Sequence, residues 1–253
     1  TENKGIIEFD NVTFTYPDGE ASVLKDISFT AKTGETVAFI GSTGSGKSTL
    51  INLIPRFYDV TEGSIKINGV DIREYDLKAL RKKIGFIPQK SLLFTGSIAN
   101  NIKFGKKNAK TGEVVHSAKV AQAYDFISKK PKQFEEIISE GGKNVSGGQK
   151  QRLSIARALV RKPEIYIFDD SFSALDLKTD AALRKALKSK TAESTVLIVA
   201  QRISTILNAE QIIVLNEGEI VGIGTHKELL KNCEVYEQIA LSQLSKEELE
   251  NEQ

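Results

Sequence analysis

A glycine-rich loop between two regular elements carries the strongest chemical pattern in the chain. Glycines leave backbone N–H groups free to surround phosphate oxygens, and the following helix would direct its positive dipole end to the same point. Residues 36–40 are apolar and β-favouring, and residues 48–57 are compatible with a helix. The pattern predicts a nucleotide phosphate site rather than a chance Gly/Ser-rich loop, and its residues are Gly41, Ser42, Thr43, Gly44, Ser45, Gly46, Lys47, Ser48 and Thr49. We expect Lys47 to reach the β- and γ-phosphates and Ser48 to offer its hydroxyl to Mg²⁺.

Polar side chains follow three apolar strands of the predicted sheet. Gln89 follows residues 84–87, which a proline ends, and Gln201 follows residues 195–200. Asp169 and Asp170 end the buried-type run at 165–170. The carboxyl ends of parallel strands are where α/β folds bind ligands. Paired carboxylates there predict a group that holds Mg²⁺ and faces an attacking water.

Two further features predict nucleotide contacts. Residues 140–149 form a second glycine-rich turn that leads into a helix, and one ATP does not need two such sites in one chain. This second turn therefore indicates an anion site that serves another subunit. Tyr16 ends an N-terminal strand and is a candidate for stacking on adenine, with packing in the core as the alternative.

The remaining pattern predicts one α/β domain that spans residues 1–253. Residues 6–16 and 23–30 predict antiparallel strands, and residues 92–129 predict mainly helices. Strands that alternate with helices give a mostly parallel sheet. A hairpin is expected at 211–222, and residues 241–253 are expected to form a flexible tail that is either a solvated helix or disordered.

Composition excludes several classes of protein. The formal charge of +2 is spread along the chain, so nucleic acid is not an expected partner. The longest apolar runs are far shorter than the ~20 residues that span a bilayer. A single cysteine, Cys233, excludes an internal disulfide and suits a reducing compartment. The chain starts at Thr1 and has no methionine, from which we expect it to be part of a longer polypeptide.

These motifs, in this order, resemble the nucleotide-binding domain of ATP-binding cassette (ABC) transporters over about residues 6–240. The resemblance rests on the glycine loop, Gln89, the Ser-Gly-Gly-Gln signature at 146–149, Asp169, and Ser-Ala-Leu-Asp at 173–176. It implies a P-loop NTPase (RecA-like) core, an N-terminal antiparallel β subdomain, and a helical subdomain inserted at about 90–160. Residues 56–59, 92–98 and 100–102 look like the exporter branch, whose ATPase domain follows a bundle of transmembrane helices.

The resemblance also implies roles for individual residues. Two such domains would close head to tail, and each ATP would lie between the phosphate loop of one and the signature of the other. Tyr16 would stack on adenine, Asp169 would bind Mg²⁺ through water, and Gln89 would touch Mg²⁺ and the transmembrane part. Glu140 would contact the transmembrane part, unless it is an ordinary solvated carboxylate. Residues that complete the partner's ATP site would be Ser146, Gly147, Gly148 and Gln149, and Asp176 joins the nucleotide-binding residues.

Two positions depart from the family pattern. Asp170 stands where a glutamate usually orients the attacking water, and Gln201 stands where a histidine is usual. Aspartate is one methylene shorter, and a misplacement of ~1 Å costs about 10²-fold in rate. Glutamine can bond a γ-phosphate but cannot become positively charged. His116 and His226 are expected on the surface, where neither can replace the histidine that is usual at position 201.

The departures predict a domain that binds ATP but hydrolyses it weakly in its own half-site. The expected setting is one half of a heterodimeric exporter, on the cytoplasmic face of the cell membrane. A slow homodimer and a regulatory ATP-binding module remain alternatives. A chromosome-maintenance ATPase is disfavoured, because residues 90–145 are too few for its long coiled coil and lack sustained heptads.

Overall fold

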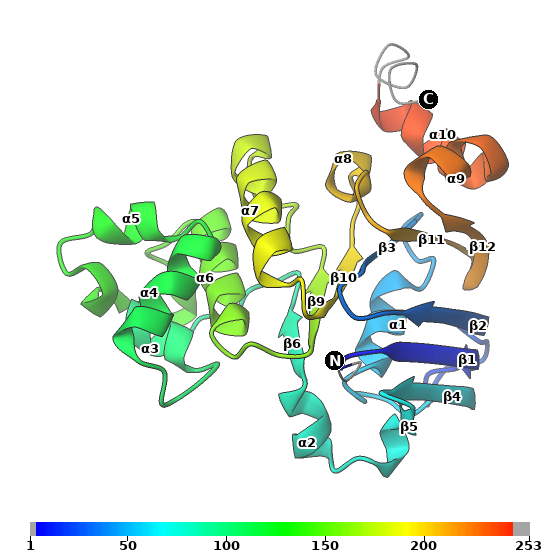
Figure 1. Ribbon diagram of the computed structural model, residues 1–253, viewed down its shortest axis with the longest axis horizontal. Helices are drawn as coiled ribbons and strands as arrows, with labels where there is room; N and C mark the ends of the chain where they lie inside the picture. The colour runs from blue at the N-terminus through cyan, green and yellow to red at the C-terminus, as the bar shows by residue number, and fades with distance from the viewer. Residues whose placement is uncertain (1–3, 245–253) are drawn as a thin grey trace.

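The computed structural model describes residues 4–244, and its central element is a six-stranded sheet, whose place in the molecule can be followed in Figure 1. Its strand order is β12-β11-β3-β10-β9-β6. Neighbouring strands from β11 to β6 run parallel, and β12 pairs antiparallel with β11 at the edge. The bounds are β3 Thr36–Gly41, β6 Ile84–Ile87, β9 Ile165–Asp169, β10 Thr195–Val199, β11 Gln211–Asn216 and β12 Glu219–Gly224.

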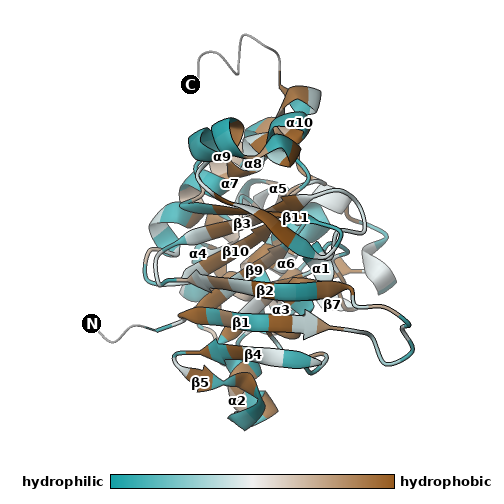
Figure 2. Ribbon diagram, turned by 90° about the vertical axis from the view of Figure 1, so that its right-hand side faces the viewer, coloured by the Kyte–Doolittle hydropathy of each residue, from teal (hydrophilic) through white to brown (hydrophobic). Residues whose placement is uncertain are grey.

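An antiparallel sheet stands beside this central sheet. Its order is β2-β1-β4-β5, with bounds β1 Ile7–Phe14, β2 Leu24–Ala31, β4 Glu62–Ile67 and β5 Val70–Asp71. In Figure 2 the central strands are largely hydrophobic, whereas β1 and β2 alternate between hydrophobic and hydrophilic residues. The reason is burial: all five residues of β10 are buried, while β2 buries alternate residues along most of its length. The apolar faces of the two sheets share one core cluster with α1.

Helices cover the central sheet and gather beyond its β6 edge, where α3 to α6 lie together (Figure 1). The bounds of the helices are α1 Lys47–Leu53, α2 Leu77–Lys82, α3 Ile98–Lys103, α4 Thr111–Val120, α5 Tyr124–Ser128, α6 Gly147–Leu159, α7 Leu177–Lys190, α8 Ile203–Ile206, α9 His226–Asn232 and α10 Glu234–Gln243. A two-stranded sheet of β7 (Gly96–Ser97) and β8 (Ile137–Ile138) lies among α3 to α6. The predicted α/β fold class, with its parallel sheet, antiparallel part and helical insertion, is confirmed. No helix within residues 4–244 has the length and apolar character that crossing a membrane requires.

Three sequence-based expectations need correction. The helix after the glycine loop ends at Leu53 instead of Phe57, because Pro55 cannot continue it and Arg56 has a φ of 55°. His226 is only 4% exposed, since it begins α9 and its Nδ1 lies 2.7 Å from the Tyr236 hydroxyl. His116 is exposed, as expected.

The predicted tail is the third correction. Residues 241–243 are the last residues of α10, and Gln243 bonds to the chain just after β10. The amphipathic pattern of α10 explains this, because Tyr236 and Ala240 are buried on one face of the helix. Residues 245–253, the rest of the predicted tail, lie outside the described part of the chain.

Candidate nucleotide-binding site

Strand register brings the predicted site residues to one edge of the central sheet. Val199 pairs with Phe39 on one side and with Asp169 on the other, and Leu215 pairs with Gly41. The strands β3, β9 and β10 therefore end side by side. Loops that leave these strands share a single cleft of about 580 Å³.

Glycines shape the loop that connects β3 to α1. Gly44 and Gly46 have φ values of 82° and 102°, which side chains disfavour, and Gly46 is the N-cap of α1. At Gly41, a Cβ would lie 2.2 Å from the Leu215 carbonyl oxygen, so only glycine fits there. The loop thus needs glycine for conformation at two positions and for close approach at a third.

Lys47 lies at the centre of the loop. Its ammonium donates to the carbonyls of Gly41 and Ser42, each at 2.8 Å, and to the Ser45 hydroxyl at 3.2 Å. Burial lowers the pKa of Lys47 below its ordinary value, although the negative charge of Asp170 opposes the shift. A half-buried ammonium held by backbone carbonyls is suited to meet phosphate oxygens in the same cleft.

Asp169 faces the loop from the end of β9. The Ser48 hydroxyl donates to its Oδ1 at 3.1 Å, so a hydroxyl and a carboxylate oxygen meet at one point. Burial raises the pKa of Asp169, and the Ser48 hydrogen bond opposes the rise. These hard oxygen donors fit Mg²⁺, which binds through one or two protein groups together with phosphates and water.

Asp170 is held differently from Asp169. Its Oδ2 accepts two hydrogen bonds from side-chain amides, one from Gln89 Nε2 at 3.0 Å and one from Gln201 Nε2 at 2.8 Å. The residue is 7% exposed and has a φ of 47°, so its backbone is in the left-handed region. Burial raises the pKa of the carboxyl, while the Gln89 hydrogen bond opposes the rise. One carboxylate oxygen of Asp170 is therefore hydrogen-bonded to both Gln89 and Gln201, the two glutamines that the sequence places beside the nucleotide.

The cleft has a wall that sequence reasoning missed. Val23, Ile239, Ser242 and Gln243 line it together with the glycine loop, Gln89, both aspartates and Gln201. The Gln243 amide bridges the segment after β10: its oxygen accepts from the Ile203 N–H at 2.8 Å, and its nitrogen donates to the Gln201 carbonyl at 2.7 Å. Helical spacing of apolar residues in 235–240 was the available signal for this wall.

Tyr16 lies next to the cleft without lining it. Its hydroxyl is 2.9 Å from the Thr49 hydroxyl, and its ring packs edge-on against Phe14 and Tyr58. The ring is half-buried against the core between the sheets. Tyr16 therefore contacts the glycine loop directly, while its stacking on adenine stays a prediction.

The signature residues do not line the cleft. Ser146 caps α6 and forms a reciprocal capping box with Gln149, and Ser146 and Gly147 are exposed. A Cβ on Gly148 would lie 3.2 Å from the Ala174 carbonyl, so the signature packs against the 173–176 loop. That loop ends in Asp176, an exposed carboxylate that caps α7. Hydrogen bonds from Thr179 lower the pKa of Asp176.

Glu140 is also exposed, at the turn before the signature. Its exposure agrees with a contact site for another domain and with an ordinary solvated carboxylate alike.

Comparison with known proteins identifies the family. The model of the family "ABC transporter" matches residues 24–173. An uncharacterized ABC transporter ATP-binding protein, YfiB, of Bacillus subtilis (strain 168) is 46% identical over 243 residues, covering 96% of this chain and 42% of that protein. A putative multidrug export ATP-binding/permease protein of Staphylococcus aureus (strain NCTC 8325 / PS 47) is 47% identical over 236 residues, covering 93% and 41%.

A solved structure supports the same family assignment. The structure of a bacterial Atm1-family ABC exporter with ATP bound superposes with a TM-score of 0.93 at 37% identity, over 97% of this chain and 43% of that one. The chain thus spans about two fifths of the length of the relatives it matches. With the glycine loop, the paired aspartates and the signature all in place, the chain belongs to the ABC transporter family, as one of its ATP-binding (ATPase) domains.

Proposed function

We propose that this domain drives an exporter by closing head to tail with a second ATPase domain, and that its own half-site hydrolyses ATP slowly. The pairing partner is a different chain that retains glutamate and histidine at the positions of Asp170 and Gln201. Support for export comes from relatives whose names describe multidrug export and an ABC exporter. Support for a partner comes from the signature, since Ser146 and Gly147 are exposed and lie outside the cleft.

The main support for slow hydrolysis in this half-site is the pair of hydrogen bonds that two glutamine amides donate to Asp170. A general base has to present a free lone pair to water, and here Oδ2 already accepts from Gln89 and Gln201. Neither amide can accept or release a proton in the way that a histidine can. Asp170 can therefore act on water through Oδ2 only after these hydrogen bonds are exchanged, which leaves Oδ1 as its available oxygen. ATP binding needs only the glycine loop and Lys47, which are complete.

Each cleft residue has a distinct part in the proposed mechanism. Lys47 exchanges its carbonyl partners for phosphate oxygens, and the loop N–H groups surround the same phosphates. Ser48, Asp169 and Gln89 are the residues that would hold Mg²⁺, Asp169 through water. The bound ion would neutralise charge on the β- and γ-phosphates. Gln201 would donate its amide to the γ-phosphate, and Asp170 would orient the attacking water less accurately than a glutamate.

On the other side of the dimer, Ser146 to Gln149 would complete the partner's site, with Asp176 beside them. We place the domain at the cytoplasmic face of the cell membrane, where the regions of Gln89 and Glu140 contact transmembrane domains of the same transporter. Both regions reach the surface, because Gln89 and Glu140 are exposed.

The test restores both missing groups in one variant, Asp170→Glu with Gln201→His. In the mixed dimer with the partner chain, hydrolysis in this half-site should rise by an amount on the order of 10²–10⁴-fold, the usual contribution of a positioned acid or base. Asp170→Glu alone is the matched control and should recover only part of this gain. A wild-type chain that already turns over at ~10 s⁻¹, a typical enzyme rate, would contradict the impaired half-site.

Two other outcomes separate the alternatives. Tight ATP binding without hydrolysis in either the wild type or the double variant would favour a regulatory module. In a mixed dimer with the partner chain, Ser146→Ala should lower the partner's turnover. Unchanged turnover in that dimer, or a wild-type chain that forms an ATP-dependent homodimer alone, would exclude the heterodimer.

A further inference from the structure

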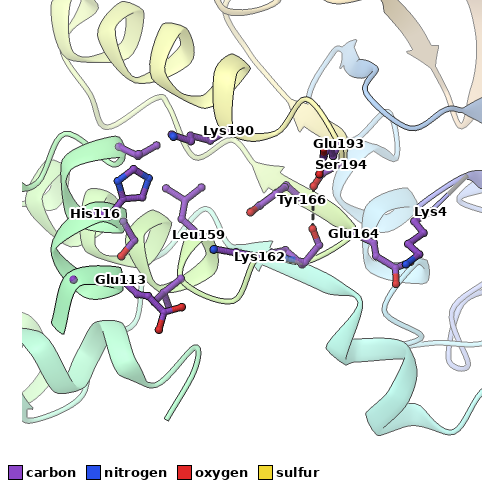
Figure 3. A pocket seen from close by; sticks show the side chains of 15 residues that line it. Lys4, Glu113, His116, Leu159, Lys162, Glu164, Tyr166, Lys190, Glu193 and Ser194 are labelled. Atoms are coloured by element: carbon purple, nitrogen blue, oxygen red, sulfur yellow. Dashed lines mark hydrogen bonds between the residues drawn. The ribbon is translucent and has the colours of Figure 1, made fainter. Parts of the chain in front are cut away.

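A second cavity, of about 470 Å³, lies outside the nucleotide-binding cleft. Its walls come from α4, the end of α6, the start of β9 and the end of α7 (Figure 3). None of its lining residues lines the nucleotide-binding cleft, which opens at the opposite ends of the strands. The volume falls within the ~300–1,000 Å³ that is usual for small-molecule sites.

The walls of this cavity are apolar. Val120, Leu159 and Val160 are 8%, 7% and 2% exposed, and Pro163 is buried beside them. They belong to the same core cluster that joins the helices to the central sheet. Such a surface favours the apolar body of a ligand over water.

One polar side chain that lines the cavity has no hydrogen-bond partner within residues 4–244. It is Tyr166, which is only 3% exposed as a residue and whose hydroxyl makes no hydrogen bond in the described part of the chain. Figure 3 shows this hydroxyl directed into the cavity, toward Leu159 and Lys162. A tyrosine hydroxyl is protonated at neutral pH and can donate a hydrogen bond, and burial raises the pKa of Tyr166 further, to about 12.

The charges around the cavity favour an anion. Glu113 and Glu164 line it, but each is already paired from outside, with Lys106 at 2.7 Å and with Lys83 at 2.8 Å. Lys162 and Lys190 also line it and have no ion pair with any residue that the structure describes. Glu193, the third lining glutamate, offsets only one of these two lysine charges, so the remaining charge at the cavity is positive.

We propose that this cavity binds a small amphipathic organic anion, a carboxylate or sulfonate on an aromatic or branched apolar body. The body would lie against Val120, Leu159 and Val160, and the acid would reach Lys162 and Lys190. A polar atom of the ligand would accept from Tyr166. Such a ligand would bridge α4 and α6 to β9 and α7, and so would connect the helix that carries the signature to the strand that carries Asp169.

The probe is 8-anilinonaphthalene-1-sulfonate, titrated by fluorescence into the chain with saturating Mg-ATP present, so that the nucleotide-binding cleft is filled. We expect one saturable site. Tyr166→Phe should weaken binding about fivefold, the usual effect of one hydrogen bond. Lys162→Glu should weaken it at least as much, and added salt should reduce that difference. The neutral analogue N-phenyl-1-naphthylamine should be insensitive to Lys162→Glu.

The matched control is Lys178→Glu, which makes the same charge change in the first turn of α7, whereas Lys190 ends that helix. It should leave dye binding unchanged, and Mg-ATP affinity should report correct folding of every variant. Since Lys162 is exposed, its variant tests the site even where Tyr166→Phe lowers stability. Equal dye affinity in wild type, Tyr166→Phe and Lys162→Glu would overturn the proposal. So would dye binding that is seen without Mg-ATP and is absent at saturating Mg-ATP.

Discussion

The amide of Gln243 makes a specific prediction about how α10 supports the nucleotide-binding cleft. In Gln243→Ala the Ile203 N–H loses its acceptor, and Ile203 is 0% exposed. An orphaned buried donor costs about 1–3 kcal/mol. The bond to the Gln201 carbonyl is partly solvated and adds less. For a domain of this size, each kcal/mol corresponds to about 2–4 °C in Tm, so the variant should melt about 2–12 °C lower.

Mg-ATP affinity should fall as well. The carbonyl that Gln243 holds belongs to Gln201, whose side chain reaches Asp170 in the cleft. In Gln243→Ala the segment around Gln201 is less well held, so part of the free energy of Mg-ATP binding is used to order that segment. A loss of about 1 kcal/mol corresponds to about fivefold in Kd. Calorimetric titration with Mg-ATP measures this change, and differential scanning calorimetry measures the change in Tm.

Two controls make the Gln243 experiment sharp. Gln243→Glu keeps an acceptor for Ile203 but loses the donor to Gln201, so it should retain most of the Tm and still bind Mg-ATP more weakly. Gln238→Ala changes another glutamine of α10, an exposed one that bonds only to Glu234 within the described residues. If Gln243→Ala lowered Tm and affinity no more than Gln238→Ala, the reasoning about this wall would be refuted.

Three further changes have defined outcomes. Lys47→Ala should abolish tight Mg-ATP binding, because it removes the cation that meets the phosphates; unchanged affinity in calorimetry would show that the loop is not the phosphate site. Gly41→Ala should lower the free energy of unfolding by about 1–3 kcal/mol in urea titrations, since the new Cβ would be 2.2 Å from the Leu215 carbonyl oxygen. Asp170→Asn should raise Tm at pH 7, because a carboxyl whose pKa is raised on folding destabilises the fold once it ionises. That gain should shrink as the pH falls toward the ordinary aspartate value of 3.8, and a gain that is independent of pH would contradict this cause.

Features that depend on local backbone chemistry were readable from the sequence. The central strands are continuous apolar runs because both of their faces are buried. The glycine loop is recognisable because its backbone adopts positive φ values that favour glycine. The positions of Gln89, Asp169, Asp170 and Gln201 followed from strand ends, because parallel strands share one edge.

Features that depend on contacts between distant segments were not readable. The pairing of β7 with β8 joins residues about 40 positions apart inside a region that reads as helical. His226 was expected on the surface, yet Tyr236 on the next helix offers it a buried partner. Gln243 looked like part of a tail, because its two partners belong to the segment after β10. In each case the structure depends on contacts between segments that are distant in sequence, which local residue propensities do not report.

The position of β3 in the central sheet has a consequence for biosynthesis. This strand lies between β10 and β11, and the Thr36 N–H donates to Glu210, which follows it by 174 residues. At ~5–20 residues per second, a ribosome needs on the order of 10–30 s to supply those neighbours. Until then β3 has no partner on either edge, and closing so long a loop slows folding. The glycine loop is thus made well before its neighbouring strands and is among the last parts of this domain to reach its final shape.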